Sequence, residues 1–195
     1  IVRKELYKMS NECCAYCGKK ISCIEMDVDH FLPSSKFPYL SYCWYNFLPS
    51  CKLCNQSFKK DIYPKISQNI TLVERCLINE DLKDKGVKIT KPMLFTKKIV
   101  LNKVFINDRL IDPSFDEIEE HLEFNPLLYN YKGKTNIGKK TADTFFSKVE
   151  FQKSIEGISN IVLRIVYEGN SYNLVGDLIE TYGYEFYYDI YWDFW

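Results

Sequence analysis

Hydrophobic and polar positions in the first 65 residues predict short elements set around two cysteine pairs. Residues 2–12 carry apolar side chains at the spacing of one helix face, and residues 21–30 partly alternate, as in a half-buried strand. Prolines and serines over residues 33–38 predict an irregular loop. After the second cysteine pair, residues 55–60 are expected to open a helix that ends before Pro64.

The remaining 130 residues predict mixed elements with more helix. Asp112-Pro113-Ser114, followed by several acidic residues, is typical of a helix start. The lysine-rich stretch 132–140 is expected to be a loop, and helices are expected over 142–149 and 154–167. We therefore predict an α+β protein, with a compact module over residues 1–65 and a mainly helical accessory region over residues 66–195.

Composition is that of a globular protein, with 46% hydrophobic and 27% charged residues. No apolar run reaches the length of a membrane span, because Arg164 interrupts the longest candidate, residues 158–167. The first residues do not resemble a signal peptide, since Arg3, Lys4 and Glu5 break any apolar stretch. The expectation is a cytoplasmic protein without membrane contact, in which cysteines stay reduced.

The charge is zero overall but unevenly distributed. Residues 1–65 hold ten Lys/Arg against six Asp/Glu, whereas the remaining 130 hold sixteen against twenty. The positive excess of the first part is what a phosphate-facing surface would have. An ordinary solvated surface would account for the same difference, so charge alone does not decide.

Four cysteines form a CxxC…CxxC set: Cys14, Cys17, Cys51 and Cys54. A tetrahedral zinc ion takes four such ligands, and each pair can place two thiolates on one side of it. Cys13 does not fit the two-residue spacing and is expected to lie outside the set. This zinc would be structural, because four thiolates leave no open position for a substrate. The alternative is four buried thiols without a metal.

A second group of polar residues falls between and just after the cysteine pairs. Asp29-His30 and Asn46 lie between them, and Asn55 directly follows the second pair. A neutral imidazole accepts a proton from water near pH 7, and carboxylate and amide oxygens are ligands for Mg²⁺ or Mn²⁺. These types suit hydrolysis of a phosphodiester bond. The other histidine, His121, lies in an acidic stretch and is expected to be structural.

Several charged residues surround this group. Lys59 and Lys60 follow Asn55 by about one helical turn and are predicted, with Lys36, to contact nucleic-acid phosphates. In a strand over residues 21–30, Glu25 and Asp27 would share a face with Asp29, but we expect Asp29 alone to reach a cation. Four further lysines either follow a nucleic-acid backbone or belong to an exposed loop: Lys132, Lys134, Lys139 and Lys140.

The order of these motifs resembles the four-cysteine branch of the HNH endonucleases. The match covers CxxC, DHxxP, an asparagine and CxxCN followed by lysine, over about residues 10–62. The resemblance implies a ββα-metal fold, in which a hairpin and a helix grip one divalent cation. It makes His30 the general base, Asn46 the tether of the loop after it, and Asp29 and Asn55 the cation ligands. The final position is Asn55 where the family often has His, which favours a hard cation, Mg²⁺ or Mn²⁺.

A further resemblance concerns residues 32–38 and 110–124, which are similar to the HNH subunit of Septu-type and retron-linked anti-phage systems. It implies an effector nuclease, with DNA the favoured substrate, that works with an ATPase subunit. The segment after residue 140 departs from that pattern. The main rival interpretation is a nonenzymatic zinc ribbon that binds nucleic acid or protein. Such a module needs the cysteines but has no use for Asp29, His30 and Asn55 together.

The C-terminus is unusually aromatic. Its last fourteen residues hold nine aromatic side chains, three acids and no Lys or Arg. Packing in a core is the ordinary use of such residues. Aromatic residues are also enriched at the centres of protein interfaces, and we predict that this segment docks the ATPase partner.

Overall fold

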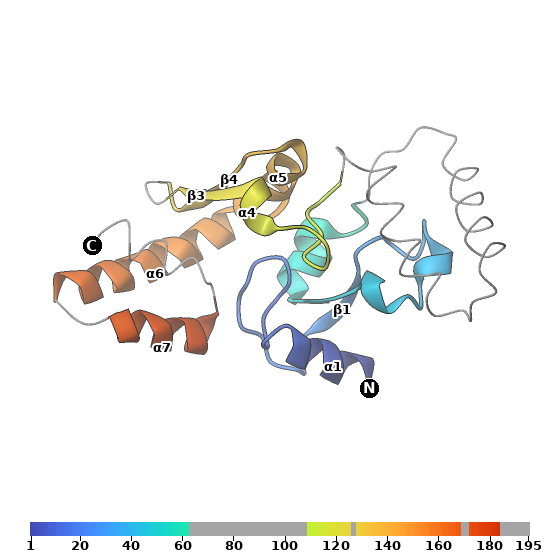
Figure 1. Cartoon of the computed structure of the whole chain (residues 1–195), viewed down its shortest axis with the longest axis horizontal. Helices are drawn as coiled ribbons and strands as arrows, with labels where there is room; N and C mark the ends of the chain where they lie inside the picture. Colours follow the sequence, from blue (N-terminus) through green and yellow to red (C-terminus); the bar gives the residue numbers. More distant parts are fainter. Residues whose placement is uncertain (63–108, 126–127, 169–171, 184–195) are drawn as a thin grey trace.

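The computed structural model describes residues 1–62, 109–125, 128–168 and 172–183. In these segments, two small antiparallel sheets, each of two strands, lie among helices (Figure 1). The predicted α+β class is therefore confirmed for the described residues. The C-terminal aromatic segment from Tyr184 onward, and with it the predicted docking surface, lies outside them.

The first helix is shorter than predicted. Helix α1, Val2–Met9, buries Leu6, but Met9 is 68% exposed and does not share the buried face. The chain leaves the helix at Ser10, and Asn11 and Glu12 take left-handed φ angles of 51° and 65°. These angles end the helix and turn the chain toward the first cysteine pair.

The strand predicted over residues 21–30 is wrong in its first part. Strand β1 is Asp27–His30, and it pairs antiparallel with β2, Phe47–Ser50. Before it, Ser22 holds a turn, because its hydroxyl and its carbonyl accept hydrogen bonds from the amides of Glu25 and Met26, respectively. Among the described strands β2 pairs with β1 alone, and an edge position of this kind tolerates the proline at position 49.

The helix after the second cysteine pair begins earlier than predicted. It is η3, Leu53–Lys59, and it has π-helical hydrogen bonding. Two short 3₁₀ turns precede it in the chain, η1 (Pro38–Leu40) and η2 (Trp44–Asn46). The sequence β1–η1–η2–β2–η3 thus makes a hairpin followed by a helical turn.

The prediction of a loop over residues 132–140 is also wrong. Strands β3, Leu122–Asn125, and β4, Asn130–Gly133, form a second hairpin, and α5, Asn136–Thr141, follows it. Thr135 caps α5 by accepting the amide hydrogen of Gly138. A Cβ on Gly138 would lie 1.9 Å from the carbonyl oxygen of His121, so only glycine allows this close packing. Lysine content alone did not reveal these contacts.

Near residue 112 the predicted helix start is a turn instead, because the carboxylate of Asp112 accepts the amide hydrogen of Ser114. The helix α4 is a single turn, Ile118–His121. Further along, η5 is Ala142–Phe146, α6 is Val149–Tyr167, five residues longer at its start than predicted, and α7 is Tyr172–Tyr182. In Figure 1, α6 and α7 lie side by side at one end of the molecule.

One hydrophobic core joins the first 62 residues to the later segments. The ring of Tyr16 stacks on that of Phe145, with centroids 4.8 Å apart and an interplanar angle of 15°. The cluster also includes Phe31, Leu110 and Ile111, all buried. The division of the chain at residues 65 and 66 falls outside the described residues and stays a prediction.

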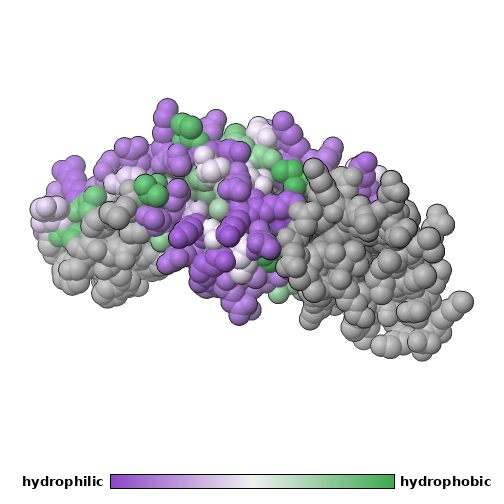
Figure 2. Space-filling view, turned by 90° about the horizontal axis from the view of Figure 1, so that it is seen from above, coloured by the Kyte–Doolittle hydropathy of each residue, from purple (hydrophilic) through white to green (hydrophobic). Residues whose placement is uncertain are grey.

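The described surface is mainly hydrophilic on the face shown in Figure 2, with hydrophobic residues in small separate groups. Among the helices that the structure describes, none has the length and apolar character needed to cross a membrane.

Candidate zinc site and active site

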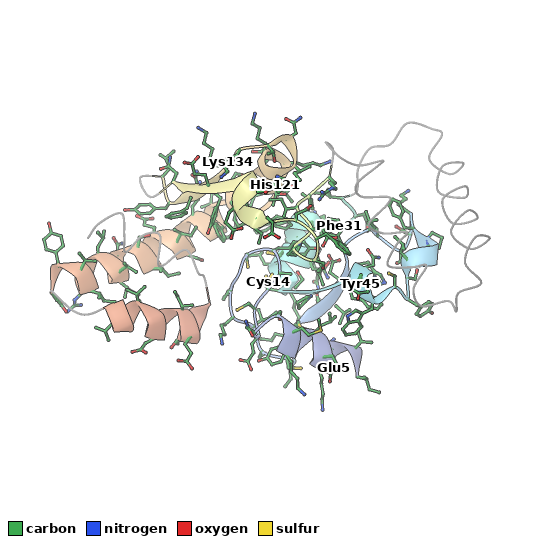
Figure 3. All side chains as sticks on the ribbon, in the orientation of Figure 1. Glu5, Cys14, Phe31, Tyr45, His121 and Lys134 are labelled. Atoms are coloured by element: carbon green, nitrogen blue, oxygen red, sulfur yellow. The ribbon has the colours of Figure 1, made fainter. Side chains whose placement is uncertain are left out.

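The first cysteine pair lies in a tight turn between α1 and β1, where Figure 3 shows Cys14. Gly18 has a φ of 72°, in the left-handed region that glycine adopts without strain, and its amide donates to the carbonyl oxygen of Cys14 at 2.9 Å. The amide of Ala15 donates to the carbonyl oxygen of Pro49 at 2.9 Å. This bond attaches the turn to β2, the strand that leads to the second pair.

The second pair lies at the junction of β2 and η3. Cys51 follows the strand, and the amide of Cys54 donates to the Sγ atom of Cys51 at 3.4 Å. The Sγ atoms of Cys14, Cys17, Cys51 and Cys54 all lie within 4.8 Å of one another. Zn–S bonds of about 2.3 Å place tetrahedral sulfurs roughly 3.8 Å apart, so a small contraction would complete such a site.

Hydrogen bonding within the cluster favours an ionised sulfur. Contacts with Cys17, then Cys51 and Cys54, hold the pKa of the Cys14 thiol well below its ordinary value, although burial opposes this. The donor set of four thiols fits zinc. Cys13 lies outside the cluster, as predicted, and its thiol contacts the carbonyl oxygen of Asn11 instead. Within the described residues, these four cysteines are the one metal-compatible group of three or more His, Cys, Asp or Glu side chains.

His30 lies at the end of β1, and its ring is fixed on two sides. Its Nε2 atom lies 3.0 Å from the carbonyl oxygen of Ser41, and its ring meets that of Phe47 edge-on with centroids 5.1 Å apart. A carbonyl oxygen only accepts hydrogen bonds, so Nε2 carries the proton. Nδ1 is then the basic nitrogen, the one able to take a proton from water.

Asn46 is fully buried at the end of η2, and its amide holds the loop that follows His30. Its Oδ1 accepts the amide hydrogen of Leu32 at 2.9 Å, while Nδ2 donates to the carbonyl oxygens of Leu32 and Leu40 at 3.0 and 3.3 Å. The amide of Phe31 also donates to the carbonyl oxygen of Asn46. These bonds fix the backbone directly after His30, the arrangement expected of a tether.

Asp29 precedes His30 in β1 and is buried, with 7% exposure. The hydroxyl of Tyr16 donates to its Oδ2. The ammonium of Lys59 lies 2.9 Å from Oδ2 and 3.2 Å from Oδ1, and also donates to the carbonyl oxygen of His30 at 2.9 Å. The pKa of Tyr16 is raised by burial first and by the neighbouring Asp29 charge second, so its hydroxyl remains a donor.

The structure therefore corrects the placement of Lys59. The sequence suggested a surface lysine beside phosphate, but the residue has 0% exposure and neutralises Asp29. The physical reason is that a buried carboxylate needs a partner, and Lys59 lies on the inner face of η3. Lys60, the next residue, is exposed.

Asn55 lies on η3 and contacts Asp27 rather than Asp29. Its Nδ2 donates to Oδ2 of Asp27 at 3.0 Å, and Nε2 of Gln56 donates to the same oxygen at 2.9 Å. Because the carboxylate of Asp27 only accepts hydrogen bonds, it faces the amide nitrogen of Asn55, and the amide oxygen of Asn55 is directed away from it. Alternation along β1 predicted that Asp27 shares a face with Asp29, but not that it orients Asn55.

A cleft of about 380 Å³ brings the predicted residues together. Asp29, His30 and Asn55 line it with Ser34 and Ser35 from the loop, and with Lys59, Lys60 and Asp61 from the end of η3. A carboxylate, an amide oxygen and an imidazole in one polar cleft fit a hard divalent cation beside a base. Lys36 is exposed on the same loop and is not among the lining residues described.

His121 is the last residue of α4 (Figure 3) and is not among the residues that line this cleft. Its Nδ1 lies 2.8 Å from the hydroxyl of Thr135, the residue that caps α5. This contact joins the end of α4 to the cap of α5, which is a structural role for the imidazole.

Three parts of the site could not be predicted from the sequence: the hydroxyl of Tyr16, the burial of Lys59 and the carbonyl oxygen of Ser41. Tyr16 lies between the two cysteines of the first pair, but no spacing rule links it to Asp29. Backbone atoms such as the Ser41 oxygen leave no trace in the sequence at all.

A four-cysteine cluster beside a cleft that holds Asp29, His30 and Asn55 is what the HNH resemblance leads one to expect. The chain is 31% identical over 136 residues to the Septu protein PtuB of Bacillus thuringiensis, a match that covers 64% of this chain and 53% of that protein. It is 36% identical over 72 residues to the Retron Vc95 putative HNH endonuclease of Vibrio cholerae serotype O1 biovar El Tor, covering 32% of this chain and 35% of that protein.

These two homologues confirm the resemblance to HNH, Septu-like proteins. The matches span about half of the first relative's length and about a third of the second's. No protein-family model matches the chain. No solved structure matches it either.

Proposed function

We propose that the chain is a metal-dependent HNH endonuclease that hydrolyses phosphodiester bonds, with DNA as its substrate, in an anti-phage defence complex with an ATPase subunit. The observation that carries this proposal is the convergence of Asp29, His30 and Asn55 in one cleft. The names of the two homologues, a Septu protein and a putative HNH endonuclease, support both the chemistry and the defence role.

In this proposal β1, β2 and η3 form the ββα-metal unit. The four cysteines hold a zinc ion that fixes the start of η3 to the hairpin and to the first cysteine turn. The bond from Ala15 to Pro49 and the position of Cys54 in η3 support that role, because the cluster connects the first turn, the hairpin and the helix. Zinc held by four thiolates stabilises the fold and takes no substrate. The thiols need a reducing compartment, which is the basis for proposing a cytoplasmic protein.

His30 acts as the general base through Nδ1. The Ser41 carbonyl oxygen keeps the proton on Nε2, and Asn46 holds the backbone so that the ring stays in the cleft. His30 then takes a proton from a water molecule as that water attacks phosphorus.

Asp29 and Asn55 would hold Mg²⁺ or Mn²⁺ through their oxygens. Such a cation, when bound, neutralises charge on the scissile phosphate and stabilises the leaving oxygen. Asp27 orients the amide of Asn55. Lys60, exposed at the rim of the cleft, and Lys36, exposed on the loop after His30, would contact flanking phosphates.

The test is a cleavage assay with purified protein on plasmid DNA and on RNA, with Mg²⁺, with Mn²⁺ and with EDTA, alone and beside any co-encoded ATPase. We expect cleavage of DNA that requires a divalent cation. Cleavage of RNA only would overturn the substrate assignment. Nucleic-acid binding without cleavage under every condition, with zinc bound, would favour the nonenzymatic zinc ribbon instead.

A further inference from the structure

Tyr16 connects three parts of the molecule that the sequence leaves separate. It lies in the first cysteine pair, between Cys14 and Cys17, its hydroxyl donates to Oδ2 of Asp29, and its ring stacks on Phe145 of η5. The residue is buried, with 7% exposure. A buried polar hydroxyl requires a partner, and here that partner is the carboxylate beside the candidate base.

We propose that Tyr16 is a positioning residue that holds the Asp29 carboxylate for cation binding, so that the zinc turn and η5 together set the affinity of the active site for its cation. The inference rests on the proposed function, in which Asp29 is a cation ligand. It deepens that proposal by assigning a residue that touches neither cation nor substrate.

The geometry supports this role in two ways. Asp29 has two buried donors, Tyr16 and Lys59, which approach from different elements, the first cysteine turn and η3. Lys59 supplies charge but is a flexible chain with a rotatable ammonium, whereas the tyrosine ring is rigid. Stacking on Phe145 and attachment of the turn to β2 leave that ring little freedom.

Outer hydrogen bonds to a ligating carboxylate typically affect metal affinity by about 10-fold to 100-fold. Tyr16→Phe keeps the ring and its stack and removes only the hydroxyl. The whole chain carrying Tyr16→Phe, loaded with zinc, would be titrated with Mn²⁺, and electron paramagnetic resonance would measure the Mn²⁺ that remains free. Wild type, Asp29→Ala and Tyr167→Phe would be titrated in the same way. Tyr167 is 91% exposed on α6 and serves as the matched control.

We expect Tyr16→Phe to weaken Mn²⁺ binding about 10-fold to 100-fold with zinc stoichiometry unchanged, and Tyr167→Phe to match wild type. Wild-type affinity in Tyr16→Phe, with binding lost in Asp29→Ala, would overturn the role of Tyr16 and leave the proposed cation site standing. Wild-type affinity in Asp29→Ala would instead overturn the cation site itself, and the Tyr16 inference with it.

If Tyr16 had only a structural role, Tyr16→Phe would lower the zinc content or the melting temperature without changing the affinity of the folded protein for Mn²⁺. If Tyr16→Phe is recovered without zinc, the titration is repeated with Phe145→Leu. That substitution loosens the stacking on the Tyr16 ring and keeps the Tyr16 hydroxyl. Weaker Mn²⁺ binding by zinc-loaded Phe145→Leu supports the proposal, and wild-type affinity overturns it.

Discussion

The Nζ atom of Lys59 lies 2.9 Å from Oδ2 of Asp29, and both of these largely buried side chains line the candidate active site. A buried ion pair is costly to assemble, and removing one partner leaves the other charge uncompensated. Asp29 therefore has a positively charged neighbour inside the protein. Any divalent cation that binds Asp29 shares the carboxylate with this ammonium.

Lys59→Met is expected to destabilise the protein when no divalent cation is present. Loss of one partner of a buried pair typically costs about 3–5 kcal/mol, because Asp29 would remain buried and charged. Mn²⁺ should then raise the melting temperature of the variant more than that of wild type, since the cation replaces the missing charge. Differential scanning fluorimetry with and without Mn²⁺ measures both effects.

Lys60→Met is the control for this prediction, since Lys60 is exposed and adjacent in sequence. It should melt like wild type. Equal Mn²⁺ shifts in wild type and Lys59→Met would show that the ammonium and the cation do not share Asp29.

The zinc site gives a second prediction. Cys54→Ser should release zinc and unfold at least the first 62 residues, because structural zinc contributes on the order of 10 kcal/mol in small sites. Elemental analysis and circular dichroism of purified protein measure both outcomes. Cys13→Ser, outside the cluster, should keep wild-type zinc. A wild-type protein without zinc would refute the account of this cluster.

Asn46→Ala tests the tether. The change leaves the amide and carbonyl of Leu32 without their side-chain partner, at a cost of about 1–3 kcal/mol for each buried group left unsatisfied. Urea unfolding should show this loss, and cleavage should fall at unchanged zinc content. Asn160→Ala, at an exposed position on α6, is the control. Full cleavage by zinc-loaded Asn46→Ala would remove the tether from the mechanism.

The C-terminal segment gives a prediction that rests on sequence alone. The candidate anchors for an ATPase partner are Tyr187, Tyr191, Trp192 and Trp195. Aromatic hot spots contribute about 2 kcal/mol or more, so Trp192→Ala or Trp195→Ala should reduce co-purification with the ATPase. The melting temperature should stay close to that of wild type. A variant that melts far lower yet still binds its partner would show that the segment belongs to the core.

The sequence predicted the cysteine cluster well because ligand spacing is a local property. Each CxxC pair lies in one turn, and the four thiols meet once the two turns come together. The candidate site was predictable to the same extent, since Asp29 and His30 are adjacent in one strand and Asn55 follows the second pair directly. The cleft that brings them together was not, because it also depends on where residues 33–35 of the loop lie.

Elements that depend on packing were predicted poorly. The end of β4 and helix α5 lie where lysines suggested a loop, because Gly133 and Gly138 let backbones approach more closely than composition reveals. Lys59 was misplaced for a related reason. Charged side chains are exposed on average, but a buried carboxylate such as Asp29 is stabilised by a buried lysine.

The proposed role of His30 as the general base of a nuclease is tested by the single-turnover cleavage rate of His30→Ala on DNA with Mg²⁺ or Mn²⁺. We expect this rate to fall about 10²-fold to 10⁴-fold with zinc content and melting temperature unchanged, since a positioned base contributes that much. His121→Ala removes the other imidazole, which contacts Thr135 away from the cleft, and its folded fraction should cleave like wild type. A folded, zinc-loaded His30→Ala protein that cleaves at the wild-type rate would show that His30 is not the general base.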